Sequence, residues 1–103
     1  MADLLVDEYS VLDRVLAEAK NRALEGKGKE RHASEGMPFE EQPIMAISKM
    51  VGIGFPLGQV QKKCHEARRF SEGGRGAQAR EELQDCIVYL CAAILQLEKD
   101  HDL

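Results

Sequence analysis

The stretch Arg80–Lys99, REELQDCIVYLCAAILQLEK, is the most strongly patterned part of this 103-residue sequence. Large aliphatic residues recur in it at alternating spacings of four and three residues: Leu83, Ile87, Leu90, Ile94 and Leu97. This spacing is typical of a helix that packs along a partner helix. From Cys86 to Leu95 the intervening residues are also largely apolar. We therefore expect this helix to lie in the middle of a bundle or at a subunit interface.

A second helical segment precedes this stretch and is expected to pair with it. It carries an apolar stripe at helical spacing, consisting of Leu57, Val60, Cys64 and Ala67. The glycine-rich sequence at 73–76 separates the two segments and favours a turn. The simplest arrangement is a pair of antiparallel helices over residues 57–97, with Pro56 in the first turn of the first helix.

Two further helices are expected upstream, at about 6–24 and about 39–51. The first has a predicted buried stripe of Tyr9, Leu12, Val15, Leu16, Ala19 and Ala23. No segment shows the alternating pattern of a β-strand. The sequence thus predicts one all-α domain over residues 1–103, a small bundle of about four helices around the central hairpin. A chain this short has a modest core, so we expect oligomerisation to complete the bundle through the row from Leu83 to Leu97.

Composition narrows the functional classes. The net charge of −4 gives no general affinity for nucleic acids or acidic membranes. No apolar run is long enough to cross a bilayer, and the first residues lack the pattern of a signal peptide, so a cytoplasmic location is expected. The three cysteines match neither a disulfide framework nor a zinc site, and packing residues with free thiols are the expected state.

Basic residues nevertheless gather in one polar, aperiodic segment between the first two predicted helices. Its basic side chains are Lys27, Lys29, Arg31 and His32. Gly26 and Gly28 lie among them, and glycine lets a backbone approach a ligand closely. The segment is therefore a candidate anion site, with a solvated flexible loop as the alternative interpretation.

Two residues beside the apolar stripe of the 57–70 helix are further ligand candidates, namely Gln61 and Arg68. An arginine at such an edge either extends into water or reaches an anionic partner. Lys62, His65, Glu66 and Arg69 are expected on the opposite, solvated face of the helix.

Carboxylates open the following helix at Glu81, Glu82 and Asp85. In Glu82-Leu83-Gln84-Asp85 the two acidic residues share a helical face, directly before the apolar run. A hairpin with Glu-x-x-Asp at this place resembles the MazG-like all-α NTP pyrophosphatases over roughly residues 59–97. That resemblance implies Mg²⁺ held by Glu66, Glu82 and Asp85 for hydrolysis of nucleoside triphosphates.

One departure from the family pattern is chemically important. Members carry Glu-Glu-x-x-Glu on the first helix, whereas this sequence has Lys62-Lys63-Cys64-His65-Glu66. Two ammonium groups in place of two carboxylates would form ion pairs rather than a cation cage. The resemblance, read with this departure, implies nucleotide-scale binding without metal-dependent chemistry and hence without a cofactor.

Three hypotheses follow. The first is a non-catalytic protein that binds a phosphate-bearing, nucleotide-like ligand between the Lys27–His32 segment and the hairpin, where subunits meet. Such a protein would suit a phage or mobile-element accessory role in capturing a nucleotide signal. The second is a Mg²⁺-dependent pyrophosphohydrolase that recruits Glu40 or Glu41 as an additional ligand. The third is a helical interaction or inhibitor module, favoured by the apolar surface of the 80–99 helix.

Overall fold

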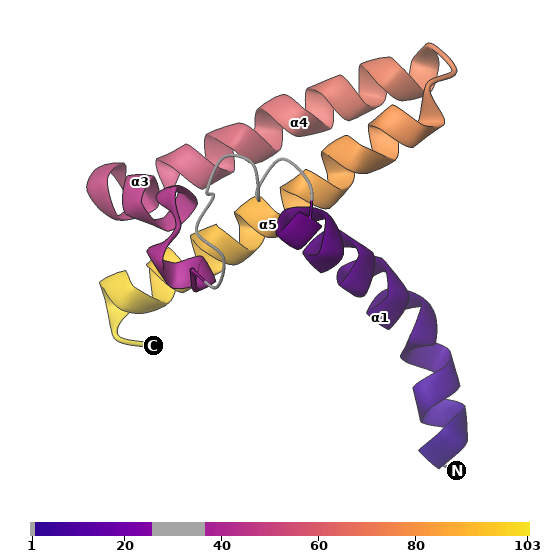
Figure 1. Cartoon of the computed structure of the whole chain (residues 1–103), viewed down its shortest axis with the longest axis horizontal. Coiled ribbons are helices and arrows are strands. Elements are labelled where there is room, and N and C mark those ends of the chain that lie inside the picture. Colours follow the sequence, from indigo (N-terminus) through magenta and orange to yellow (C-terminus); the bar gives the residue numbers. More distant parts are fainter. Residues whose placement is uncertain (1, 26–36) are drawn as a thin grey trace.

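The computed structural model describes the backbone at residues 2–25 and 37–103, and the side chains at residues 8–25 and 37–103. All regular structure in these ranges is helical (Figure 1). The elements are α1 (Ala2–Glu25), the 3₁₀-helix η1 (Phe39–Glu41), α3 (Pro43–Val51), α4 (Gly54–Glu72) and α5 (Gly76–His101). The predicted all-α bundle with a central hairpin is confirmed, and the hairpin consists of α4 and α5.

The turn between α4 and α5 follows from its glycines. Gly74 has a φ of 76°, a conformation that costs glycine nothing. The N–H of Gly74 donates to the carbonyl of Ser71, and the N–H of Arg75 donates to the carbonyl of Phe70. These two bonds form a Schellman motif, which satisfies carbonyls that the end of α4 would leave unpaired. The chain then reverses direction, and α5 runs back along α4 (Figure 1).

The helix predicted at 39–51 is two helices in the structure. Gln42 separates η1 from α3 and adopts an extended conformation, with φ −74° and ψ 157°. The residue before a proline is sterically disfavoured in the α region, and Pro43 follows Gln42 directly. Pro43 occupies the first position of α3, where its missing N–H leaves no hydrogen bond unmade.

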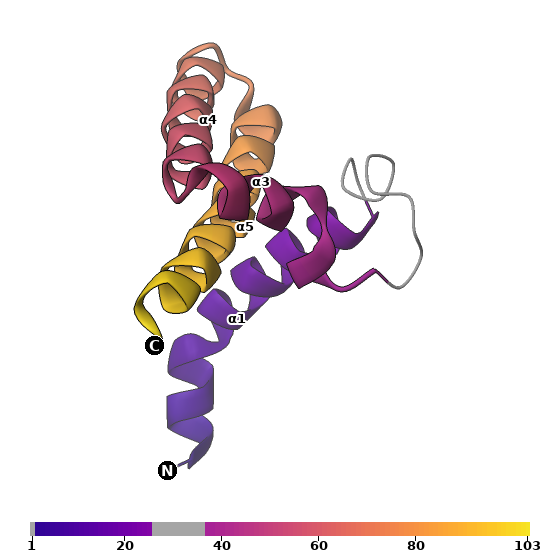
Figure 2. The same cartoon turned by 90° about the vertical axis from the view of Figure 1, so that its left-hand side faces the viewer.

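The predicted buried stripe of α1 is wrong for its N-terminal half. Tyr9, Leu12 and Leu16 are 60%, 52% and 46% exposed, whereas Ala19 is 1% exposed. Figures 1 and 2 show the reason, because α1 meets the hairpin only near its C-terminal end and then extends away from the rest of the chain. Among the described residues, the apolar side chains of Tyr9 and Leu12 in the projecting half are therefore exposed.

The helix α5 buries small residues rather than its large aliphatic row. The buried positions on α5 are Ala79, Cys86, Ala92, Ala93 and Gln96. By contrast, Leu83, Leu90, Ile94 and Leu97 are 50%, 43%, 56% and 39% exposed. Ala79, Cys86 and Ala93 are spaced by seven residues and therefore lie on one face of α5. Their small side chains allow this face to pack against the rest of the chain. Of the predicted row, Ile87 is half-buried, and the other four residues form an apolar surface that is exposed in the described part of the chain. We call this surface the α5 seam (Leu83, Leu90, Ile94 and Leu97).

Candidate functional site

Charged side chains from three helices meet where α1 reaches the hairpin. On α4, Lys63 extends towards α5 and places its Nζ 3.2 Å from Glu82 Oε2 and 3.1 Å from Asp85 Oδ2. All three side chains are largely buried, with exposed fractions of 21–24%. The ammonium group thus bridges the two carboxylates of the Glu-x-x-Asp motif.

Arg22 of α1 shares Asp85 with Lys63 and also pairs with Glu81. Its Nε donates to Asp85 Oδ1 at 2.8 Å, and its Nη1 lies 3.6 Å from Glu81 Oε2. Asp85 therefore accepts from two cations that come from two different helices. We refer to Arg22, Lys63, Glu81, Glu82 and Asp85 as the ion-pair cluster.

The electrostatics of the cluster keep both cations charged. Burial by itself would lower the pKa of Lys63, but hydrogen bonds and attraction from Asp85 and Glu82 outweigh burial and raise it above its ordinary value. The hydrogen bond to Asp85 likewise raises the pKa of Arg22, against a smaller opposing effect of burial. The cluster is consequently a set of ion pairs at neutral pH.

This arrangement differs from a metal centre. Within residues 8–25 and 37–103, no group of three His, Cys, Asp or Glu side chains is placed to hold a metal ion. A divalent cation near Glu82 and Asp85 would have to displace Lys63 and Arg22, both of which carry positive charge. Such a cation would meet repulsion where a metalloenzyme provides additional oxygen ligands.

The predicted metal ligands are only partly brought together. Glu82 and Asp85 share Lys63, whereas Glu66 accepts from Arg69 Nη1 of its own helix at 3.2 Å. The buried face of α4 is rotated from the predicted one, because Ala67 is buried and Lys63 is half-buried while Cys64 is exposed. Ion pairing and an apolar stem allow Lys63 to occupy this face.

The predicted ligand residues on α4 are at the surface. Gln61 is exposed, and the side chain of Arg68 is 81% exposed. Arg68 Nε donates to Glu72 Oε1 at 3.0 Å within the same helix. The other four predicted ligand residues, Lys27, Lys29, Arg31 and His32, lie outside the described residues.

Basic side chains concentrate at the turn end of the hairpin. Residues 59–80 contain six Lys or Arg against two Glu, a formal charge of +4 in a chain of −4. Arg68, Arg69, Arg75 and Arg80 are exposed there, and we call them the basic hairpin surface. Figure 1 shows that this end of the hairpin points away from α1 and α3. Solvent and ligands can therefore reach it.

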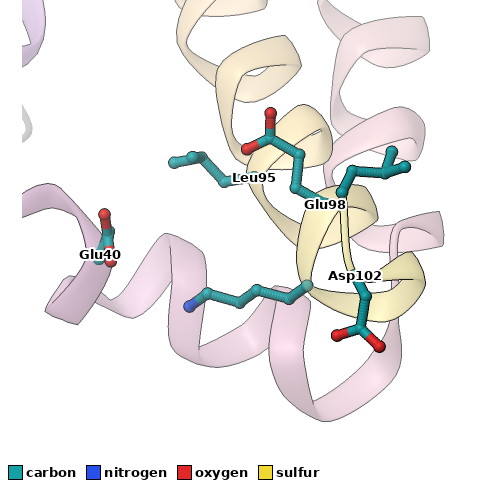
Figure 3. Close-up of a pocket in the computed structure, with 6 residues that line it drawn as sticks. Glu40, Leu95, Glu98 and Asp102 are labelled. Atoms are coloured by element: carbon teal, nitrogen blue, oxygen red, sulfur yellow. The ribbon is translucent and has the colours of Figure 1, made fainter.

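A shallow cavity of about 430 Å³ lies at the opposite end of α5 (Figure 3). Its lining residues are Glu40, Leu95, Glu98, Lys99, Asp102 and Leu103. Glu98 follows Asp85 by thirteen residues on the same helix, which corresponds to about 20 Å. Glu40 thus lies with Glu98 and Asp102 rather than with the ion-pair cluster, and the structure gives no support for its predicted recruitment as a metal ligand.

Arg22 was not predicted to be part of the site. Helical spacing could have indicated it. Arg22 follows the buried Ala19 by three residues, so both side chains lie on the face of α1 that packs against the hairpin. Lys63 was named only through its alignment with a family carboxylate. Its buried position was not predicted, since a lysine at the centre of a helical interface is unusual unless it is paired.

Comparisons with models of known protein families, with curated proteins and with solved structures yield no match. Of the helices in the described ranges, none combines the length and the apolar character that a membrane crossing demands.

Proposed function

We propose that this protein is a non-catalytic binder of a phosphate-bearing, nucleotide-like ligand, which it contacts through the basic hairpin surface. The observation that carries the proposal is the group of four exposed arginines at the free end of the hairpin, in a chain whose formal net charge is −4. Arginine presents a planar set of donors that matches phosphate oxygens, and its hydrogen bonds to phosphate are charge-assisted.

Arg68 is the principal ligand residue in this proposal. Its present partner, Glu72, lies one turn further along α4, and the two side chains are 81% and 65% exposed. Exposed pairs of this kind contribute only about 0–1 kcal/mol. Arg68 can therefore leave Glu72 and bind phosphate at little energetic cost. Gln61 and the Lys27–His32 segment, predicted from the sequence, complete the proposed contact set.

The ion-pair cluster supports the non-catalytic part of the proposal. In the enzyme alternative, Glu82 and Asp85 hold Mg²⁺, but here each of them accepts from Lys63, and Asp85 accepts also from Arg22. Removing a buried charge from its partners is costly, so these ion pairs oppose metal entry. As the biological role, we propose that a cytoplasmic phage or mobile-element protein of this kind captures a nucleotide signal.

A thermal-shift screen with ATP, GTP and cyclic dinucleotides tests the proposal, because a ligand that binds the folded state raises the melting temperature. We expect Arg68→Ala to weaken binding about tenfold or more, since one charge-assisted hydrogen bond contributes ~1.5–3 kcal/mol. Arg14→Ala is a matched control, because Arg14 is also exposed and paired with a glutamate four residues later. Lys62→Ala is expected to have only a slight effect. A binding isotherm that Arg68→Ala leaves unchanged would disprove the assignment of this site.

A second candidate function, an interaction module that associates through the α5 seam, has a specific observation in its favour. Four large aliphatic side chains of one helix are 39–56% exposed in a single copy. Contiguous exposed apolar surface is typical of protein–protein contacts. We propose that a second copy of the chain covers the α5 seam, so that the protein is a homo-oligomer. Light scattering that gives only a monomer of 11.5 kDa at high micromolar concentration would contradict this.

A further inference from the structure

Two thiols from different helices touch at the centre of the hairpin. Cys64 of α4 and Cys86 of α5 place their Sγ atoms 3.8 Å apart. The two residues follow Lys63 and Asp85 directly, so the thiol pair lies next to the 3.1 Å ion pair between those side chains. Lys63 thus contacts Asp85, and Cys64 contacts Cys86, so that two adjacent contacts cross the hairpin.

We propose that Cys64 and Cys86 are a reversible redox pair, which hydrogen peroxide converts to a disulfide that cross-links α4 to α5. A disulfide requires an S–S distance of about 2.05 Å, and the thiols need to approach by less than about 2 Å. The third cysteine, Cys91, is exposed and serves as an internal reference for the reaction.

The environments of the two thiols assign different roles to them. Cys64 is exposed, so peroxide reaches it, whereas Cys86 is 5% exposed and shielded from solvent. Cys64 is thus the cysteine that meets peroxide first, and Cys86 is the resolving cysteine beside it.

The reaction balances in two steps. The Cys64 thiolate attacks one oxygen of hydrogen peroxide, the O–O bond breaks, and Cys64 sulfenic acid and water form once a proton is taken up. The Cys86 sulfur then attacks Cys64 Sγ, the S–OH bond breaks, and the thiol proton of Cys86 leaves with the hydroxyl as a second water. Overall, two thiols lose two electrons and two protons, and one peroxide is reduced to two waters. A dithiol reductant reverses the reaction by thiol–disulfide exchange.

The test is to treat the reduced full-length protein with hydrogen peroxide, denature it, alkylate it with N-ethylmaleimide and measure the intact mass. We expect the oxidised chain to be lighter by two hydrogens and to carry one maleimide, on Cys91, where the reduced chain carries three. The melting temperature should rise by about 10 °C, because the cross-link restricts the unfolded chain. Dithiothreitol should restore both properties.

Variants make the outcome decisive. Cys64→Ser removes an exposed thiol, is expected to fold, and should abolish the loss of two hydrogens, whereas Cys91→Ser should retain it. The proposal is overturned if the oxidised chain still takes up three maleimides, if Cys64 proceeds to the sulfinic acid while Cys86 stays free, or if the only cross-link joins Cys91 residues of two chains.

Discussion

The ammonium nitrogen of Lys63 lies 3.1 Å from Oδ2 of Asp85, across the interface between α4 and α5. The alignment with the MazG-like motif, which stays a prediction from the sequence, places Lys63 at a carboxylate position and Asp85 at a metal-ligand position. In this protein the side chains of Lys63 and Asp85 form a direct ion pair.

This relationship predicts a gain of metal response from a single change. Lys63→Glu should lower the free energy of unfolding without metal, because it adds a third carboxylate beside Glu82 and Asp85. It should also create Mg²⁺-dependent stabilisation, since three carboxylates can ligate a hard cation. Thermal unfolding with and without Mg²⁺ measures both effects, and Lys62→Glu, at an exposed position, is the control. An equal Mg²⁺ response in the unaltered protein would show that Lys63 does not exclude the ion.

Arg22 is expected to be the main polar attachment of α1. Arg22→Gln should lower the free energy of unfolding by about 1–3 kcal/mol, because Asp85 is largely buried and loses a charged donor. Hydrogen exchange should accelerate in α1 more than in α4. Arg14→Gln removes an exposed pair within α1 and should change stability by less than about 0.5 kcal/mol. Equal effects of the two substitutions would refute this role of Arg22.

Stability should fall at alkaline pH because of Cys86. Its pKa is raised by burial and by the neighbouring Cys64, from 9.0 to about 11, so the unfolded chain loses this proton at lower pH than the folded chain does. The contribution of the Cys86 thiol to the free energy of unfolding is fully present below pH 9 and is lost as the pH rises to about 11, by up to about 3 kcal/mol. The raised pKa of Lys63 acts in the same direction at still higher pH. Urea unfolding across this range should show a flatter profile for Cys86→Ala and an unchanged slope for Cys91→Ala.

Association through the α5 seam should depend on individual apolar positions. Ile94→Asp places a charge on a side chain that is 56% exposed in one copy, so a single chain should still fold. In an assembled interface the same charge would be buried without a partner, and we expect dissociation to a monomer in light scattering. Gln78→Asp adds the same charge at an exposed position of α5 outside the seam and should leave the molar mass unchanged. A monomeric unaltered protein, or assembly that survives Ile94→Asp, would rule out this interface.

The helical hairpin was predictable because its signals are local. The spacing of Leu83, Ile87 and Leu90 indicates a helix whatever surrounds it, and the glycines at 73 and 74 end the preceding one. The proline rule also explains the break at Gln42, although the sequence analysis placed both segments in one helix.

The packing partners were not predictable in the same way. Periodicity shows that Tyr9 and Leu12 share a face with Ala19, but it does not show that Ala19 is buried while Tyr9 and Leu12 are exposed. Similarly, the position of Lys63 in the interface depends on Glu82 and Asp85 arriving from another helix. Contacts of this kind depend on the relative placement of helices, which sequence periodicity does not encode.

The one-sided docking of α1 bears on how that helix forms. A free helix of its projecting length is barely stable in water, because nucleating a first turn is unfavourable while extending an existing one is not. The turns around Ala19 and Arg22, held against α5, supply that nucleus, and helical order then propagates from them towards the N-terminus. A glycine introduced at Ala17, which is exposed, would interrupt this propagation without touching the hairpin. The helical conformation of the projecting half of α1 thus depends on residues that lie more than one turn away from it.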